Sequence, residues 1–292
     1  MLAIYTPTYN REKELFKLYN TLCQQTNKNF FWLVVDDGST DSTEETVQRW
    51  VKESIIKISY VKKENGGKHT AINTALDIVN DYWNVCIDSD DWLMDKNSID
   101  IVLSDIAKIK EQPDVISILY PYQFKNIELK NKNHNFKELK DCDPRDKKNG
   151  VLETTTISRP NAYGNNRFPL FENENFIAES ALETLKFMEG TILYKHTPLV
   201  QGEYLASGLT HNIVNTWKKN PKGYYYVRNL SVKYYNANHR YIKALIPLGQ
   251  MVALNIDLKK NIFLGIDSKY KLQGLFSIPL GLGYWFKKFK NN

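Results

Sequence analysis

Apolar segments alternate with segments of helical periodicity along the first 120 residues of the chain. Five short apolar runs predict β-strands, at residues 2–7, 31–36, 56–61, 83–88 and 114–121. Between them, apolar side chains recur every three to four positions and predict amphipathic helices, at residues 11–25, 41–53, 69–79 and 98–109. This alternation predicts a Rossmann-like α/β fold, in which helices cover both faces of a mostly parallel sheet.

The pattern changes after residue 120. Residues 122–150 are rich in Lys, Asn and Asp and poor in apolar side chains, which indicates a solvated surface excursion. Further elements are expected downstream: strands at 150–157, 191–196 and 199–205, and a helix at 176–188. From residue 211 the periodicity is mainly helical. The sequence therefore predicts an α/β domain over residues 1–210 and a mainly helical region over residues 211–292.

Composition and charge change this picture little. The chain has 292 residues, of which 42% are hydrophobic and 25% charged, as in soluble globular proteins. The net charge of +6 comes from scattered basic residues, apart from the ending FKKFKNN, and predicts no nucleic-acid partner. Cys23, Cys86 and Cys142 form no CxxC pair, which argues against a zinc site or a disulfide framework and fits a cytoplasmic location.

The start of the chain and its apolar runs bear on the same question of location. The opening MLAIYTPTYNRE has neither a basic segment nor a long apolar one, so we expect no signal peptide. No apolar stretch reaches about 18 residues, so we expect no membrane-spanning helix.

Chemically unusual loops follow the first four predicted strands. They read TPTYNRE, DDGSTD, KKENGGKHTAIN and DSDDW. In an open parallel sheet, ligands bind outside the carboxyl ends of the strands, and loops distant in sequence meet there. Each loop taken alone has an ordinary explanation as a turn or a helix cap. Four of them at one predicted edge indicate a binding site.

Three of these loops have the chemistry to bind a nucleoside diphosphate. Asp36 and Asp37 can accept hydrogen bonds from a base imide or a ribose, and Tyr9 can stack on the base. The pair Gly66–Gly67 allows close backbone approach just before a helix N-terminus, where anions are favoured. Lys68 adds a positive charge beside that terminus.

The fourth loop carries closely spaced carboxylates. In extended backbone, Asp88 and Asp90 would point to the same side about 7 Å apart, close enough to reach one Mg²⁺ or Mn²⁺. Ligands that are all oxygen atoms favour such a hard cation over zinc. A solvated acidic turn is the alternative interpretation of this loop.

The four loops together resemble a known family. YTPTYNRE, VVDDGSTDST, ENGGKHTAIN and CIDSDDW are similar, in order and spacing, to the motifs of family 2 glycosyltransferases with the GT-A fold. The motifs cover residues 2–92, and RFPLFENENFIAES and EYLASGLTHN extend the resemblance more weakly. The resemblance implies a GT-A catalytic domain over 1–210, with a nucleotide-binding half at 1–120 and an acceptor half at 121–210. It also implies sugar transfer from a nucleoside diphosphate to an acceptor hydroxyl, usually with inversion.

The resemblance implies roles for single residues. Asp37 would contact the base, with Asp36 as support, and Asp91 would orient the two metal-site aspartates. Of these two aspartates, Asp90 would bind the metal, and Asp88 would bind either the metal or the ribose. Asn73 would be mainly structural. The residues expected to bind the nucleotide-sugar are Pro7, Tyr9, Arg11, Asp36, Asp37, Asn65, Gly67, Lys68, Asp88 and Ser89.

An inverting mechanism needs a general base that takes the proton of the acceptor hydroxyl. Many relatives use a Glu-Asp pair at the start of a helix that follows the sheet. The matching stretch here, FENENFIAESALE, offers Glu172, Glu174 and Glu179, but Ser180 stands at the position of the expected Asp. We favour Glu179 as the base, with Glu174 as the second choice.

Several residues have two open interpretations. His211 is either a downstream metal ligand or a loop histidine, and His69 is either a phosphate donor or a helix-start residue. Trp92 either packs beneath the metal loop or stacks on a sugar. The tail 275–292 combines apolar, aromatic and lysine side chains, so it either lies on an anionic membrane or docks as a terminal helix.

The expected enzyme is a metal-dependent hexosyl- or N-acetylhexosaminyltransferase. The resemblance implies a donor that is UDP-linked by default, Mn²⁺ or Mg²⁺ as cofactor, and a glycan or lipid-linked glycan as acceptor in bacterial surface polysaccharide or glycoconjugate synthesis. Two alternatives are weaker. A sugar nucleotidyltransferase would carry a glycine-rich loop where TPTYNRE has no glycine, and an inactive nucleotide- or glycan-binding module is supported by Ser180 alone.

Overall fold

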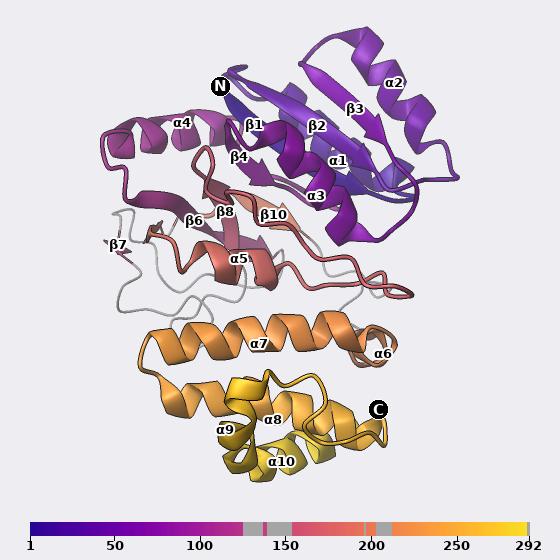
Figure 1. The fold of residues 1–292 in the computed structure, drawn as a ribbon. Coiled ribbons are helices and arrows are strands. Elements are labelled where there is room, and N and C mark those ends of the chain that lie inside the picture. Colours follow the sequence, from indigo (N-terminus) through magenta and orange to yellow (C-terminus); the bar gives the residue numbers. More distant parts are fainter. Residues whose placement is uncertain (125–136, 139–153, 196, 203–211, 291–292) are drawn as a thin grey trace. The chain divides into compact units, whose positions relative to one another are not determined.

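The computed structural model describes residues 1–124, 137–138, 154–195, 197–202 and 212–290 (Figure 1). Contacts divide the chain into two compact units. The first comprises Met1–Asn165 and Glu189–Tyr204, and the second comprises Asn166–Met188 and Leu205–Asn292. The sequence predicts a boundary at residue 210, whereas contacts group the segment 166–188 with the C-terminal helices. The functional division into a nucleotide half and an acceptor half stays a prediction.

The first unit is built on one mixed sheet. Its strands within the described residues are β1 (Leu2–Thr8), β2 (Phe30–Asp36), β3 (Ile58–Lys62), β4 (Trp83–Cys86), β5 (Asp91–Leu93), β6 (Val115–Phe124), β7 (Lys137–Glu138), β8 (Thr154–Ser158), β9 (Thr191–Tyr194) and β10 (Val200–Gly202). The order is β3-β2-β1-β4-β8-β6-β10-β5, with β9 beside β6 and β7 beside β9. Strands β3, β2, β1 and β4 are mutually parallel, as predicted. Strand β8 runs antiparallel to both β4 and β6, so the sheet is mixed beyond that point.

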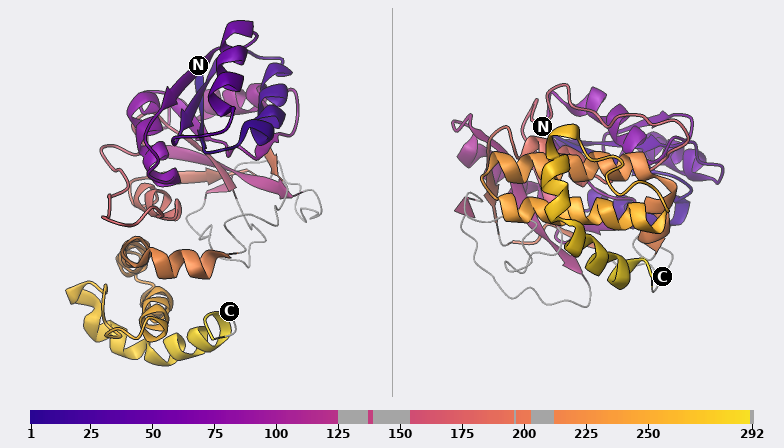
Figure 2. Two further views of the ribbon diagram at one scale, coloured as in Figure 1. Left: turned by 90° about the vertical axis from the view of Figure 1, so that its right-hand side faces the viewer. Right: turned by 60° about the horizontal axis from the view of Figure 1, so that its bottom comes forward.

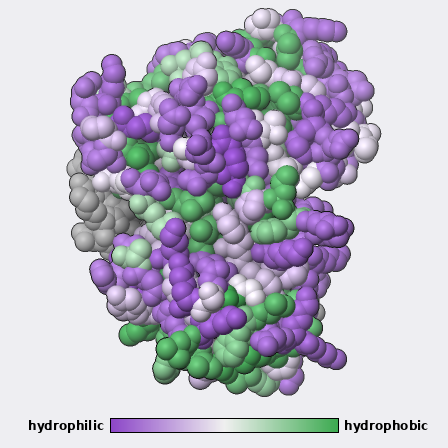
Figure 3. Space-filling view, in the orientation of Figure 1, coloured by the Kyte–Doolittle hydropathy of each residue, from purple (hydrophilic) through white to green (hydrophobic). Residues whose placement is uncertain are grey.

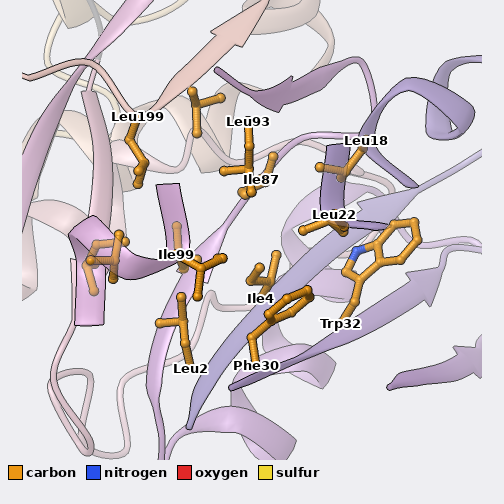
Figure 4. Packing of buried hydrophobic residues seen from close by; sticks show 14 of the residues in the cluster. Leu2, Ile4, Leu18, Leu22, Phe30, Trp32, Ile87, Leu93, Ile99 and Leu199 are labelled. Carbon is orange, nitrogen blue, oxygen red and sulfur yellow. The ribbon is translucent and has the colours of Figure 1, made fainter. Parts of the chain in front are cut away.

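Helices cover this sheet on both sides. They are α1 (Glu12–Cys23), α2 (Thr43–Glu53), α3 (Lys68–Val79) and α4 (Ser98–Ile109). Apolar side chains of α1, α2 and α4 join Leu2, Ile4 and Trp32 of the sheet in one buried cluster (Figure 4). The helix α3 packs on β1 and β2 and lies in front of the sheet in Figure 1. Every residue of β1 and β2 is buried, which is what an apolar strand covered on two faces requires.

Two short strands near the fourth loop differ from the sequence expectation. The sequence predicts a strand over 83–88, but β4 ends at Cys86, and a turn closed by the Asp91 amide on the Asp88 carbonyl (3.1 Å) follows. The strand β5 then begins at Asp91 and pairs antiparallel with β10. Hydrogen bonds between these distant segments therefore fix the end of the acidic loop.

The second unit is helical within its described residues. Its helices are α5 (Ser180–Lys186), α6 (Ile213–Lys219), α7 (Pro221–Ala237), α8 (Tyr241–Asp257), the short 3-10 helix η4 (Ser268–Tyr270), α9 (Lys271–Phe276) and α10 (Ile278–Lys288). Figure 2 shows α7 and α8 side by side, with α10 packed on α8. Their shared core includes Tyr224, Leu248 and Met251. Among the described helices, none has both the length and the hydropathy needed to cross a bilayer.

Candidate functional site

The first two loops at the carboxyl edge of the sheet are tied together by Asn10. Strand register places Thr8 beside Asp36, so the two loops leave the sheet side by side. The Asn10 amide donates to Ser39 Oγ (2.8 Å), and its side-chain oxygen accepts from the Thr40 amide (2.8 Å). Asn10 has a φ of 51°, a conformation that Asn tolerates better than most residues. The structure thus brings together the two loops that the sequence predicts at one edge.

Asp36 is fully buried, and its carboxylate fixes the conformation of the loop that follows β2. One oxygen accepts a hydrogen bond from the Ser39 amide (2.7 Å), and the other accepts from the Tyr60 hydroxyl (2.6 Å). Burial, followed by the bond to Asp36, raises the pKa of Tyr60, so this phenol stays protonated and donates. Both carboxylate oxygens of Asp36 are therefore engaged within the protein.

Asp37 folds the glycine loop back onto the second strand-end loop. Its Oδ1 accepts from Lys63 Nζ (2.7 Å) and from the Gly66 amide (3.0 Å), while Oδ2 accepts from the Gly67 amide (2.7 Å). The Asn65 side chain donates to the Asp37 carbonyl (2.9 Å). A carboxylate oxygen can accept two hydrogen bonds, so Oδ2 keeps the capacity for one more donor. The base contact predicted for Asp37 needs such capacity to accept a hydrogen bond.

Glycines allow this close packing of loops. Gly38 has a φ of 80°, and a Cβ there would lie 2.9 Å from the Asn65 amide nitrogen. Gly67 has a φ of 93° at the position that precedes α3. Both positions therefore favour glycine on conformational grounds. The result is that the N-terminus of α3, with Lys68 as its first residue, faces the same edge as the loop of Asp37.

Three carboxylates gather at the fourth loop. Oxygen atoms of Asp88, Asp90 and Asp91 all lie within 4.8 Å of one another. The turn after β4 brings Asp91 into a group that an extended backbone would limit to Asp88 and Asp90. Lys68 Nζ lies 2.7 Å from Asp88 Oδ2, which connects the glycine loop to the acidic loop. We call Asp88, Asp90 and Asp91 the acidic trio.

Asp91 is the most perturbed member of the trio. Burial, then the charge of Asp88 and more weakly that of Asp90, raises the pKa of Asp91 to about 8, against a smaller opposing effect of a hydrogen bond with the Tyr122 hydroxyl. At neutral pH the isolated trio therefore holds a proton on Asp91. A cation placed among the carboxylates would favour the ionised form and release that proton.

Gly202 leaves the space that Asp91 and Tyr122 occupy. It pairs with Asp91 across β10 and β5 and with Phe124 on β6. A Cβ at Gly202 would collide with both the Tyr122 hydroxyl and Asp91 Oδ1. Gly202, Tyr122 and Lys63 are not among the residues that the sequence predicts for the site. A lone glycine inside a predicted strand is the one signal that could have drawn attention to Gly202, since it often marks a close approach.

The acidic trio fits a hard divalent cation. One oxygen from each of the three carboxylates lies within 4.8 Å of the others, and carboxylate oxygens are the ligands that Mg²⁺ and Mn²⁺ favour. Burial is the main cause of the raised pKa of Asp91, and the charges of Asp88 and Asp90 add to it, as expected for carboxylates that repel one another. The ion would be held by Asp90 and Asp88, with Asp91 bordering them.

Other residues predicted for the nucleotide site lie along the same edge. Pro7 is within the buried strand β1, Tyr9 just beyond it is 47% exposed, and Ser89 is buried in the acidic loop. Arg11 forms an ion pair with Glu14 (3.3 Å) at the start of α1. Asn73 lies half-buried in α3.

The structure bears on two of the open interpretations. The His69 ring is buried near the start of α3, and this burial lowers its pKa, which favours the neutral form. This supports the interpretation of His69 as a helix-start residue. Trp92 has the Lys17 ammonium 4.7 Å from its ring centroid, which supports packing against α1. His211 lies outside the described residues.

The candidate bases belong to the second unit. Both carboxylate oxygens of Glu174 cap the start of α7, accepting from the Lys222 amide (2.9 Å) and the Gly223 amide (2.8 Å). Glu179 directly precedes α5, its carbonyl accepts from the Leu182 amide (3.1 Å), and its side chain is exposed. Glu172 is also exposed. The two favoured glutamates therefore differ in what is seen of them: both oxygens of Glu174 accept from a helix end, and the Glu179 side chain is exposed.

Comparisons with solved structures show the fold. The structure of Staphylococcus aureus TarS residues 1–349 in complex with UDP matches with a TM-score of 0.60 and 15% identity, over 97% of this chain and 88% of that one. The mannosyltransferase PcManGT from Pyrobaculum calidifontis, in complex with GDP-Man and Mn²⁺, matches with a TM-score of 0.53 and 17% identity, over 96% of this chain and 86% of that one. Both likenesses support a GT-A fold, as predicted.

Comparisons of sequence show the family. Glycosyltransferase GlyA of Streptococcus pneumoniae is 33% identical over 44% of this chain and 18% of its own length. Poly(ribitol-phosphate) beta-N-acetylglucosaminyltransferase TarS of Staphylococcus aureus is 33% identical over 31% of this chain and 16% of its own length. The chain thus matches less than a fifth of the length of these curated relatives. The family described as "Glycosyl transferase family 2" matches residues 3–168, which is more than half of the chain, and the chain therefore belongs to that family.

Proposed function

We propose that this glycosyltransferase moves a hexosyl or N-acetylhexosaminyl group from a UDP-linked donor to an acceptor hydroxyl, with inversion and with help from Mn²⁺ or Mg²⁺. The observation that carries the proposal is the acidic trio, joined through the Lys68–Asp88 ion pair to the glycine loop at the N-terminus of α3. The UDP complex of TarS and the Mn²⁺ complex of PcManGT support the donor type and the ion by analogy.

The acceptor is proposed from the relatives. TarS is named as a poly(ribitol-phosphate) N-acetylglucosaminyltransferase, and TuaG of Bacillus subtilis, 31% identical over 33% of this chain, as a putative teichuronic acid biosynthesis glycosyltransferase. We infer a bacterial glycan or lipid-linked glycan as acceptor, in surface polysaccharide or glycoconjugate synthesis. The proposed setting is the cytoplasm, at the inner face of the cytoplasmic membrane.

The proposed roles follow the contacts at the sheet edge. The exposed Tyr9 ring stacks on the base, and Asp37 Oδ2 accepts a hydrogen bond from it. The N-terminus of α3 and Lys68 face the diphosphate, where backbone amides and an ammonium favour negative charge. Asp90 and Asp88 would hold the metal, which when bound stabilises the charge of the departing diphosphate.

We propose Glu179 as the general base. Its side chain is exposed at the start of α5, whereas both carboxylate oxygens of Glu174 accept hydrogen bonds from amides of α7. As the acceptor oxygen attacks the anomeric carbon, its proton passes to the Glu179 carboxylate while the bond to the diphosphate breaks. Glu179→Gln should lower turnover by about 100-fold or more, because general-base catalysis contributes about that much. An unchanged turnover in Glu179→Gln would move the role to another residue.

The deciding experiment measures release of nucleoside diphosphate from a panel of nucleotide-sugars, with Mn²⁺ and with a chelator. We expect release from a UDP-sugar that rises when a glycan acceptor is added and stops in the chelator. Turnover that persists in the chelator would contradict the metal role. Binding without any release, even with acceptor mixtures, would favour the inactive module for which Ser180 is the one sequence argument. The anomeric configuration of the product, read by NMR, tests inversion.

A further inference from the structure

The helices α9 and α10 expose several large apolar side chains. Six large side chains there have exposed fractions between 44% and 71%: Leu272, Leu275, Phe276, Leu280, Leu282 and Phe286. The atoms coloured as hydrophobic gather along the lower edge of Figure 3, where Figure 1 draws α8, α9 and α10. We call these six residues the α9–α10 face. Soluble proteins seldom expose so many large apolar groups on neighbouring turns without a binding partner.

The opposite side of α10 is held against α8, so the α9–α10 face cannot turn inward. A Cβ at Gly281 would lie 2.9 Å from the Gly249 carbonyl oxygen and 2.7 Å from Val252 Cγ1, which means that the two helices touch at their backbones. Trp285 Nε1 donates to Asp257 Oδ1 (3.3 Å) from the same inner side. Because Leu282 and Phe286 lie on the side of α10 away from these contacts, they remain in solvent.

Positive charge borders the α9–α10 face at both ends. Lys269 lies in η4 and Lys271 is the first residue of α9, while Lys287 and Lys288 end α10 and Lys290 follows it. All five are exposed. Residues 241–290 contain eight lysines and two acidic residues, Asp257 and Asp267. Asp257 is already paired with Lys218 (2.9 Å). The apolar surface therefore has a strongly cationic border with one exposed carboxylate, that of Asp267.

We propose that the α9–α10 face binds the surface of an anionic lipid bilayer. An apolar helix face bordered by lysines is suited to lie in the plane of the interface, with apolar side chains among the acyl chains and lysines at the anionic headgroups. The helix α10 has 11 residues and is about 16 Å long, half the thickness of the hydrocarbon core, so it lies on the bilayer rather than across it. The Lys290 ammonium lies 4.8 Å from the Phe286 ring centroid, so a positive charge lies directly beside the exposed apolar side chain.

Charge decides between a bilayer and a second copy of the chain. A two-fold dimer through this face would bring the same patch from both copies together and oppose lysines with lysines. Like charges across an interface disfavour association, whereas an anionic bilayer neutralises them. The proposed partner is therefore the membrane surface.

The test is partition of the full chain onto vesicles, measured by co-sedimentation without any sugar donor. We expect strong binding to vesicles of phosphatidylcholine mixed with phosphatidylglycerol and weak binding to phosphatidylcholine alone. Raising salt from about 0.1 M to about 1 M should weaken binding, because it shortens the Debye length from about 10 Å to about 3 Å. Equal binding to both kinds of vesicle would overturn the role given to charge.

Variants separate the two contributions to membrane binding. Lys287→Glu with Lys288→Glu should reduce partition about 25-fold or more, and Phe276→Ser with Phe286→Ser about tenfold or more. The charge control is Lys13→Glu with Lys52→Glu, two exposed lysines of the first unit, and the apolar control is Leu170→Ser, which is 72% exposed outside this face. Circular dichroism melts check that each variant folds.

Three outcomes would overturn the proposal. The first is unchanged vesicle binding in both double variants, and the second is an equal loss of vesicle binding in the control variants. The third is a protein that does not bind vesicles but forms a dimer in solution, which Phe276→Ser with Phe286→Ser dissociates. Because no donor or acceptor is present, none of these results depends on the proposed transferase reaction. Loss of transferase activity with intact vesicle binding would contradict the proposed function alone.

Discussion

Two groups of aspartates lie at the same edge of the sheet and have opposite surroundings. Asp36 and Asp37 are buried, and amides, a phenol and an ammonium group saturate most of their acceptor capacity. Asp88, Asp90 and Asp91 are half-buried and face one another. Hydrogen-bond donors of the protein engage the first pair, which shapes the loops, whereas the three carboxylates of the trio lie close enough together to repel one another. Identical side chains therefore hold loops in one place and form a candidate metal site in the other.

The largest effect is expected from Asp90→Ala. Transfer should fall by about 1000-fold, or about 4 kcal/mol, because a metal contributes several kcal/mol to stabilising the leaving group. The unfolding midpoint should stay the same or rise, since one of three repelling carboxylates is removed. Steady-state kinetics and thermal melts measure the two quantities. Asp81→Ala, an exposed aspartate beyond α3, is the matched control. A large loss of stability in Asp90→Ala would make the trio a structural element like Asp37.

The reverse behaviour is expected from Asp37→Ala. This change removes the acceptor of the half-buried Gly66 and Gly67 amides and one of the acceptors of the Lys63 ammonium, at a cost of about 3 kcal/mol in unfolding free energy. Chemical denaturation measures that cost, again against Asp81→Ala. UDP affinity should fall as well, because the glycine loop loses its anchor. If stability were unchanged while UDP binding disappeared, Asp37 would belong with the ligand-binding carboxylates instead.

A smaller effect is expected at Gly202, which borders the trio without carrying charge. Gly202→Ala adds a methyl group where Asp91 and the Tyr122 hydroxyl lie, and such overpacking costs about 2 kcal/mol. We expect Mn²⁺ affinity, followed by titration calorimetry, to weaken by about 30-fold. Gly283→Ala is the control, because a Cβ there meets no atom within 4 Å. Tyr122→Phe removes the hydroxyl that the new methyl group meets, so combining it with Gly202→Ala should restore part of the Mn²⁺ affinity. If the losses from the two changes simply add, the clash with Tyr122 is not the cause.

The smallest effect is expected from Glu174→Gln, which extends the comparison to the second unit. Glu174 resembles Asp37, since backbone amides engage both of its oxygens. Removing its charge at the start of α7 should cost about 1 kcal/mol of stability and leave turnover unchanged. Denaturant unfolding and steady-state kinetics check this, with Glu172→Gln as the exposed control. A loss of turnover without a loss of stability would restore Glu174 as a candidate base.

Local patterns in the sequence were enough to predict the parallel part of the sheet and the position of the loops. The helix predicted over residues 98–109 coincides with α4, and the strand predicted over 2–7 is one residue shorter than β1. Periodicity reports which face of each element is buried, and a parallel sheet then places all strand ends at one edge. Local pattern therefore places the acidic loop and the glycine loop at the same edge of the sheet.

Tertiary structure alone decided which residues complete these loops. Lys62 and Lys63 are neighbours in sequence, yet Lys62 pairs with Glu44 on α2 (2.7 Å) and Lys63 binds Asp37. Gly202 and Asp91 are more than 100 residues apart and meet because β10 pairs with β5. The segment 166–188, which carries Glu174 and Glu179, joins the helices of the second unit. Such partners cannot be predicted from local pattern, because hydrogen bonds, ion pairs and steric fit depend on distances in space and not along the chain.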